Sequence, residues 1–243
     1  MELRGATALI TGGAHRLGRH IVLRLAQEGA NVVINYHRSG SDAADTVRAA
    51  EALGVRALAL QADASDPLQV EQMLAQVLST FSRLDVFVAN AGAFRRTPLP
   101  DVSEVDWDDM IRLNFQTMLV PAQRIGRHMR AHGSGCIVAI GDVAGIRPWR
   151  EYLPYSVAKS CVVALTEGLA VELAPAVRVN AIAPGPILFP DDFDAAARQR
   201  EINQTLLRRQ GDPAQVAEAV LYLARNDYVT GTVLPVDGGR LLA

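Results

Sequence analysis

Short apolar runs alternate with amphipathic helical segments along almost the whole chain. This alternation predicts parallel strands, because two parallel neighbours must be joined by a long crossover, which is usually a helix. The expected strands cover residues 6–10, 32–36, 56–61, 85–89, 136–140, 177–183 and 232–236. A length of 243 residues suits one such unit. We therefore expect a single α/β domain over residues 1–243, with a doubly wound parallel sheet and helices on both faces.

Two stretches depart from this regular alternation. Residues 101–132 form one long helical region, whose interior Pro121 predicts a bend or a break nearby. Residues 186–210 begin with several prolines and then carry acidic side chains. Since long irregular segments beyond the carboxyl end of a strand often cover substrates, we expect a substrate-binding lid here within the domain.

Composition excludes several classes of partner. The formal net charge is only -2, with basic and acidic residues interspersed, so we expect no nucleic-acid or membrane-surface partner. No apolar run reaches membrane-spanning length, and the N-terminus lacks a signal-peptide core. No Cys/His cluster has metal-ligand spacing, so we expect no metal. These observations predict a cytoplasmic protein.

A glycine-containing turn follows the first expected strand. It runs from Thr11 through Gly12 to Gly18 and leads into an amphipathic helix. Strand, glycine turn and helix is the setting in which the backbone approaches a dinucleotide pyrophosphate, and the helix N-terminus supplies free N–H groups. The turn therefore predicts a dinucleotide site.

The end of the second expected strand bears on which dinucleotide is bound. It reads Tyr36-His37-Arg38-Ser39 and contains no acidic residue. An acid at this place binds the ribose 2′-hydroxyl of NAD, whereas an arginine accommodates the phosphate of NADP. We therefore expect NADPH.

Three further polar or aromatic residues follow expected strands or interrupt helices. Asp63 follows the third strand and either faces an adenine or caps a helix. Phe94 follows the fourth strand and either stacks on a planar substrate or packs on the core. Asn114 lies among apolar residues, as a site residue or as a polar group that satisfies the backbone.

The segment 141–159 brings together a carboxylate, a phenol and an ammonium group. Tyr155 and Lys159 are spaced i, i+4, so on a helix they share a face, and Asp142 follows the fifth expected strand. A cation one turn away favours phenolate, so we expect Lys159 to lower the pKa of Tyr155 from its ordinary value of about 10. Tyr152 is the competing phenol, but it has Ser156 rather than a lysine at i+4. We therefore expect Tyr155 to donate the proton that accompanies hydride transfer.

In order and spacing, these pieces resemble the short-chain dehydrogenase/reductase family over the full length of the chain. The matching motifs are Thr11-Gly12…Gly18, Asp63, Asn90-Ala91-Gly92, Asn114, Tyr155-x-x-x-Lys159, Val179-Asn180-x-x-x-Pro184-Gly185 and Val236-Asp237-Gly238-Gly239. The resemblance implies a Rossmann-type fold, a nicotinamide cofactor and a homotetramer. It also implies that Lys159 holds the nicotinamide ribose and that Asn114 holds a water in a proton relay.

Two positions depart from the common family pattern. The middle glycine of the turn is Arg16, and the usual catalytic serine after the fifth strand is Asp142. Together with residues 36–39, both changes resemble the pteridine reductase branch. That resemblance implies that Arg16 lies by the cofactor phosphates and the substrate, that Phe94 stacks on a pterin, and that Asp142 works with Tyr155 in protonation. An ionised Asp142 would repel a developing alkoxide, whereas a carboxyl group suits a ring that carries N–H groups.

The sequence thus favours NADPH-dependent reduction of a dihydropterin, with dihydrofolate as a further candidate, to the tetrahydro form. One alternative is a carbonyl reductase of the same family, acting for example on a 3-oxoacyl thioester, and another is a non-catalytic NADP-binding sensor. The expected catalytic residues are Asp142, Tyr155, Lys159 and Asn114, and the expected substrate contacts are Arg16, Phe94, Asp142 and Tyr155. The expected cofactor contacts are Gly12, His15, Arg16, Leu17, Tyr36, His37, Arg38, Ser39, Asp63, Asn90, Ala91, Gly92, Tyr155, Lys159, Pro184 and Gly185. Trp149, Tyr152 and Phe189 line the pocket, take part in packing or make subunit contacts.

Overall fold

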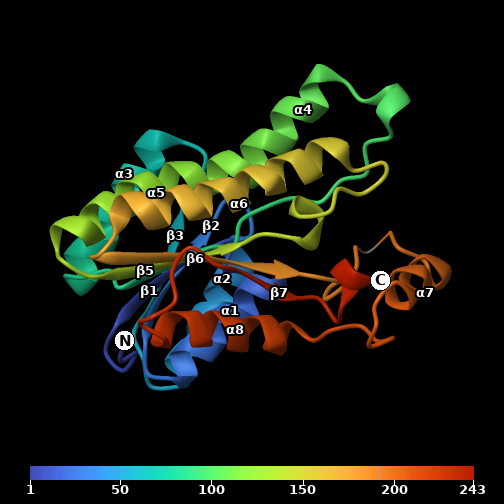
Figure 1. Ribbon diagram of the computed structural model, residues 1–243. Coiled ribbons are helices and arrows are strands. Elements are labelled where there is room, and N and C mark those ends of the chain that lie inside the picture. Colours follow the sequence, from blue (N-terminus) through green and yellow to red (C-terminus); the bar gives the residue numbers. More distant parts are fainter. Residues whose placement is uncertain (191) are drawn as a thin grey trace.

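All seven expected strands form one parallel sheet (Figure 1). The computed structural model describes residues 1–190 and 192–243. The strands are β1 (Thr7–Thr11), β2 (Asn31–Tyr36), β3 (Ala57–Gln61), β4 (Val86–Ala89), β5 (Gly135–Ile140), β6 (Val177–Pro184) and β7 (Val233–Val236). Their order in the sheet is β3-β2-β1-β4-β5-β6-β7. The predicted doubly wound α/β fold is therefore confirmed.

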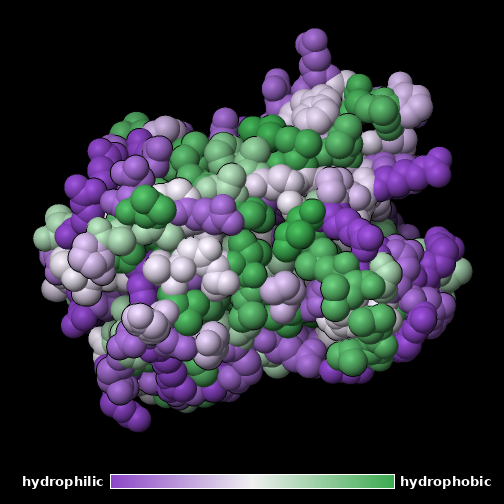
Figure 2. Space-filling model, viewed as in Figure 1, coloured by the Kyte–Doolittle hydropathy of each residue, from purple (hydrophilic) through white to green (hydrophobic). Residues whose placement is uncertain are grey.

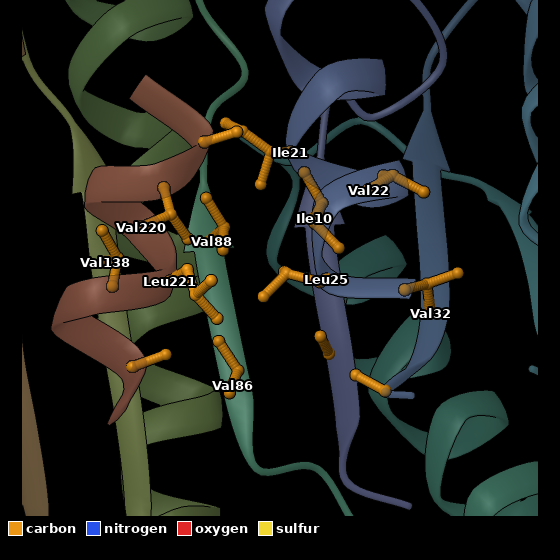
Figure 3. Packing of buried hydrophobic residues seen from close by; sticks show 14 of the residues in the cluster. Ile10, Ile21, Val22, Leu25, Val32, Val86, Val88, Val138, Val220 and Leu221 are labelled. Carbon is orange, nitrogen blue, oxygen red and sulfur yellow. The ribbon is translucent and has the colours of Figure 1, made fainter. Parts of the chain in front are cut away.

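Helices cover both faces of this sheet (Figure 1). One face packs against α1 (Arg16–Gln27), α2 (Gly40–Glu51) and α8 (Pro213–Arg225), and the other against α3 (Pro67–Phe81), α5 (Thr117–Ala131) and α6 (Leu153–Leu173). Successive strand residues point to opposite faces. Ile10 packs with Ile21 and Leu25 of α1 (Figure 3), whereas its neighbour Leu9 belongs to the core on the other face. Each of these fully buried aliphatic side chains stabilises the fold by about 2 kcal/mol.

Aspartate side chains cap the N-termini of α3 and α8. Asp66 accepts hydrogen bonds from the backbone N–H groups of Leu68 and Gln69, and Pro67 occupies the first helical position, where no N–H is needed. Asp212 forms a capping box with Gln215 at the start of α8.

The expected break near Pro121 is wrong in position. The helical region consists of α4 (Glu104–Ile111), a π-helical turn η2 (Arg112–Gln116) and α5, and Pro121 lies inside α5. The irregularity is the inserted π-helical turn, which changes the hydrogen-bond register upstream of the proline. Asn114 sits within this turn, and such turns are frequent at functional sites.

The segment after β6 contains a helix that the sequence pattern did not indicate. This helix, α7 (Ala195–Asn203), has no buried residue among its members, so it lacks the apolar periodicity by which helices are recognised. Its start is marked instead by Asp194, whose side chain accepts from the N–H of Ala197.

The surface carries several exposed apolar side chains. Figure 2 shows hydrophobic residues gathered over the middle and the top of one face, with hydrophilic residues along the left and lower rim. Tyr228, Leu242 and Val171 are among the most exposed large hydrophobic residues. That the chain assembles into a homotetramer stays a prediction. Within the described residues, no helix combines the length and the apolar character needed to cross a bilayer.

Candidate active site

A cavity of about 530 Å³ lies at the carboxyl edge of the sheet. The strand order reverses between β1 and β4, and ligands of open α/β sheets bind beside such a switch point. The cavity gathers most of the site residues expected from the sequence: Gly12, His15, Arg16, Leu17, Asn90, Ala91, Gly92, Phe94, Asn114, Asp142, Tyr155, Lys159, Pro184 and Gly185.

Asp142 and Tyr155 are directly hydrogen-bonded. Tyr155 lies in the first turn of α6, and its hydroxyl donates to Oδ2 of Asp142 at 2.8 Å. The other carboxyl oxygen, Oδ1, accepts from the backbone N–H of Ala144 at 2.7 Å and caps the 3₁₀ turn 143–145. These two bonds fix the carboxyl group at the end of β5, against the phenol.

Lys159 lies one turn along α6 from Tyr155, as expected, but it does not lower the pKa of that phenol here. Its Nζ donates to the carbonyl of Ile140 at 2.9 Å and lies 5.8 Å from the centroid of the Tyr155 ring. Burial and the adjacent Asp142 carboxyl group raise the pKa of Tyr155 well above its ordinary value. The expectation of a lowered pKa is therefore wrong for this site, because burial and the hydrogen-bonded Asp142 both raise the pKa of the phenol.

The same burial changes the two charged neighbours of the phenol. It raises the pKa of Asp142, although the Ala144 N–H and Lys159 oppose the shift. It lowers the pKa of Lys159, against the attraction of Asp142. The proton of the Asp142–Tyr155 pair is thus held more tightly than in either isolated side chain.

Asn114 ties the π-helical turn to the loop after β4. Its side-chain Oδ1 accepts from the N–H of Ala93 at 3.2 Å, and its Nδ2 donates to the carbonyl of Met110 at 3.2 Å. A Cβ added at Gly92 would lie 2.9 Å from Asn114 Oδ1 and 3.7 Å from Lys159 Nζ, so this close approach requires glycine. A role for Asn114 in a water relay stays a prediction.

The glycine turn leaves a helix N-terminus open to the cavity. Gly12 has a φ of +62°, and the N-cap residue His15 makes no side-chain capping hydrogen bond. The first turn of α1 contains no acidic residue, so its N–H groups and positive dipole end are available to an anion. The turn therefore fits a dinucleotide pyrophosphate.

Arg16 holds an unusual backbone conformation at this turn. Its φ is +49°, in the left-handed region that favours glycine, and its guanidinium donates to the carbonyl of Phe189 at 3.0 Å. A non-glycine residue there costs about 1–3 kcal/mol. The arginine that replaces the common glycine is thus kept at the expense of stability, and it connects the turn to the segment after β6.

Replacement of Arg16 by glycine should relieve this backbone strain. We expect the free energy of unfolding of Arg16→Gly to be unchanged or higher by about 1 kcal/mol, because strain relief exceeds the extra entropy of glycine in the unfolded chain. Denaturant unfolding without added cofactor measures this. Arg19→Gly is the matched control: Arg19 is exposed inside α1, and its replacement should lower the value by about 1 kcal/mol. Equal losses in both variants would contradict the assignment of strain to Arg16.

The residues expected at the adenosine end lie together but outside this cavity. Tyr36 ends β2, and the next residue, His37, accepts at its carbonyl from the side chain of Gln61 on β3. The side chain of Asp63 accepts hydrogen bonds from the N–H and the hydroxyl of Ser65, and its Oδ2 lies 3.5 Å from the guanidinium of Arg112. Burial raises the pKa of Asp63, but these hydrogen bonds and the nearby cations outweigh it, so the pKa is lowered. Arg38 is exposed, and Ser39 is the N-cap residue of α2. Contacts of this group with a cofactor stay a prediction.

An aromatic wall closes the other side of the cavity. Phe94 stacks on Tyr152 with ring centroids 4.6 Å apart and meets Tyr155 edge-on at 5.0 Å. Trp149 and Phe193 also contact Phe94 edge-on, and Phe94 remains 36% exposed. Phe94 is therefore a cavity residue rather than a core residue.

The sequence analysis left some lining residues unassigned. Trp149, Tyr152 and Phe189 all line the cavity, which was one of the expectations for them. Phe193 and Glu201 also line it and were not anticipated, because they belong to the segment whose structure had no sequence signal.

Known proteins match this chain over nearly its whole length. The family model described as Enoyl-(Acyl carrier protein) reductase matches residues 12–240. A Streptomyces violaceoruber protein named as ketoacyl reductase 2 of the granaticin polyketide synthase is 38% identical, with 97% of this chain and 96% of the relative covered. The 3-oxoacyl-(acyl-carrier-protein) reductase FabG of Staphylococcus aureus is 35% identical, with 97% and 98% covered. The structure of a short chain dehydrogenase from Burkholderia cenocepacia J2315 in complex with NADP has a TM-score of 0.92 and 34% identity, with 99% of each chain covered.

Proposed function

Because this chain belongs to the short-chain dehydrogenase/reductase family, we propose that it is an NADPH-dependent reductase of a ketone such as a 3-oxoacyl thioester. Two curated relatives are named as reductases of oxoacyl groups, whereas the sequence analysis favoured a pterin. The relatives therefore support the carbonyl alternative better than the pteridine reductase branch.

The hydrogen bond between Tyr155 and Asp142 is the observation that carries this proposal. The phenol of Tyr155 is protonated at neutral pH, and during hydride transfer it can give its proton to the oxygen of the carbonyl that is reduced. Asp142 occupies the place of the family's usual serine hydroxyl, 2.8 Å from the phenol oxygen. The pair presents its proton at the cavity, where Phe94 and Tyr152 exclude water from one side.

The raised pKa of Asp142 favours its neutral form, which would not repel a developing alkoxide as a carboxylate would. In its neutral form the carboxyl group has one O–H donor, as a serine has. A carboxylic acid kept neutral by an apolar site can serve as a hydrogen-bond donor in an oxyanion hole. Asp142 would thus replace the serine in function as well as in position.

The site fits NADPH as the hydride donor. The open N-terminus of α1 would hold the pyrophosphate, and Lys159 would hold the nicotinamide ribose. At the end of β2 no acid is present to favour NAD, and Arg38 is exposed where the 2′-phosphate is expected. When bound, the nicotinamide supplies hydride to the substrate carbon.

The proposal is tested by NADPH oxidation with the purified protein and an acetoacetyl thioester, dihydrobiopterin and dihydrofolate in parallel. We expect turnover of the thioester, with NADPH preferred to NADH. Turnover of a pterin alone would overturn the carbonyl assignment but keep the reductase assignment. Binding of NADPH without turnover of any of the three would favour the non-catalytic sensor.

A dihydropterin is the second candidate substrate, and the aromatic wall favours it. A planar ring fits against Phe94, which is already stacked on Tyr152 and partly exposed to the cavity. With this substrate an ionised Asp142 would accept hydrogen bonds from ring N–H groups. The two candidates therefore require opposite protonation states of the same carboxyl group.

A further inference from the structure

A second cavity of about 370 Å³ adjoins the active-site cavity. The two cavities share three lining residues, Trp149, Tyr152 and Glu201. Trp149 contacts Phe94 edge-on, with ring centroids 6.2 Å apart, and Phe94 contacts Tyr155. A continuous line of rings therefore leads from the phenol that donates the proton to the wall of the second cavity.

The second cavity is lined by three arginines. Arg147 and Arg150 come from the loop before α6, and Arg240 comes from the C-terminal 3₁₀ turn. Glu201 is the one carboxylate side chain among the lining residues that the structure describes. It lies 3.3 Å from Arg240, whose guanidinium also lies over the ring of Trp149 at 5.4 Å. The charge of Arg240 is thus paired with Glu201 and held in place. Arg147 and Arg150 carry the two other positive charges of this cavity.

These two remaining charges are accessible. Arg147 is exposed and donates to the backbone carbonyl of Leu241 and to a main-chain oxygen of Ala243, the last residue of the sequence. Arg150 is exposed and makes no hydrogen bond or ion pair with any residue in the described part of the chain. Neither guanidinium faces an acidic side chain within ion-pair distance among residues 1–190 and 192–243. The guanidinium of Arg150 therefore places positive charge with no acidic partner among the described residues in a cavity that adjoins the reaction site.

We propose that this second cavity binds an anionic group at the far end of the substrate, with Arg150 and Arg147 as its main contacts. This inference rests on the proposed function, because it places the reacting end of the same molecule beside Tyr155. Guanidinium groups bind carboxylate and phosphate oxygens with charge-assisted hydrogen bonds, which are stronger than neutral ones. Arg240 supports the site from the side, since Glu201 and Trp149 hold its position.

The shared chemistry is a carboxylate or phosphate on a tail, and it has two sources. A thioester of coenzyme A carries phosphates, and dihydrofolate carries the carboxylates of its glutamate. Each has a counterpart without the anion: the acetoacetyl thioester of N-acetylcysteamine and dihydrobiopterin. Comparison within each pair separates recognition of the tail from recognition of the reacting end.

The test replaces Arg150 by glutamine and measures KM and kcat for both pairs. We expect KM for the anionic member of the pair that turns over to rise about tenfold, as expected for loss of one charge-assisted hydrogen bond. KM for the tailless member and kcat for both should stay within about twofold. Arg147→Gln should act in the same direction. Arg127→Gln, at an exposed arginine of α5 that donates to the carbonyl of Gln123, is the matched control and should change nothing.

Isothermal titration of the full chain with coenzyme A and with dihydrofolate separates this proposal from the proposed function. Weaker binding of either anion by Arg150→Gln than by Arg127→Gln would support the anion site even without turnover. Equal KM changes for tailed and tailless substrates would overturn it. Binding of both anions that is unaffected by Arg147→Gln and Arg150→Gln would overturn it as well.

Discussion

Tyr155→Phe should lower kcat by about 10³-fold, within the roughly 10²- to 10⁴-fold range of general acid catalysis. The phenol is buried and donates to Asp142 at 2.8 Å, and with a pKa raised above its ordinary value it carries its proton throughout the neutral range. Phenylalanine keeps the ring and its edge-on contact with Phe94 but removes the proton. Initial rates of NADPH oxidation with the best substrate measure the effect, and NADPH affinity should change little.

Tyr152→Phe is the matched control for this variant. Tyr152 lines the same cavity and stacks on Phe94, but Lys159 is not one helical turn beyond it. We expect its kcat to stay within about threefold of the original protein. A loss in Tyr152→Phe as large as that in Tyr155→Phe would contradict the choice of proton donor.

Substitutions of Asp142 should produce the second large effect and separate the two candidate substrates. We expect Asp142→Ala to lower kcat/KM by about 10²-fold, because it removes one donor from the developing oxyanion. Asp142→Ser should recover most of this loss for a ketone, since the hydroxyl can also donate and can cap the 3₁₀ turn. For a dihydropterin we expect no such recovery.

The same substitutions should change the pH profile of kcat/KM. A carboxyl group with a raised pKa is neutral at lower pH and ionises as pH rises. If the neutral form is the donor, kcat/KM for a ketone should fall as pH rises through that pKa, and Asp142→Ser should lack this fall. A profile that instead rises with ionisation of Asp142, on the substrate that turns over, would contradict its role as a donor.

The order of strands and helices along the chain was predictable from the sequence because the central strands are buried on both faces. Val86, Phe87 and Val88 are fully buried and form a continuous apolar run, as parallel strands do. The capping residues Asp66 and Asp212 marked helix starts through local hydrogen bonds alone. Such signals depend only on neighbours in the chain, so the sequence contains them in full.

Features that depend on the environment could not be predicted in this way. No residue pattern distinguishes a π-helical turn from an α-helix. The break was therefore expected near Pro121, whereas the irregular turn lies upstream of it. The exposed helix α7 lacks an apolar face, so Phe193 and Glu201 could not be placed.

The pKa of Tyr155 is a further example of this limit. Spacing showed that Lys159 shares its helix face, but the direction of the shift depends on burial and on the distance to Asp142. Both quantities arise only when β5 and α6 are packed together. The sequence thus indicates which groups meet, and the folded environment decides their protonation.

Transfer of deuterium from NADPH is the most direct measurement of the central claim that this site reduces a carbonyl. The purified protein would be given each of the two C4-deuterated diastereomers of NADPH with the acetoacetyl thioester, and the product examined by mass spectrometry. We predict that one diastereomer delivers one deuterium to the former carbonyl carbon and that Tyr155→Phe nearly abolishes this transfer. A protein that binds NADPH but delivers no deuterium from either diastereomer would contradict the claim.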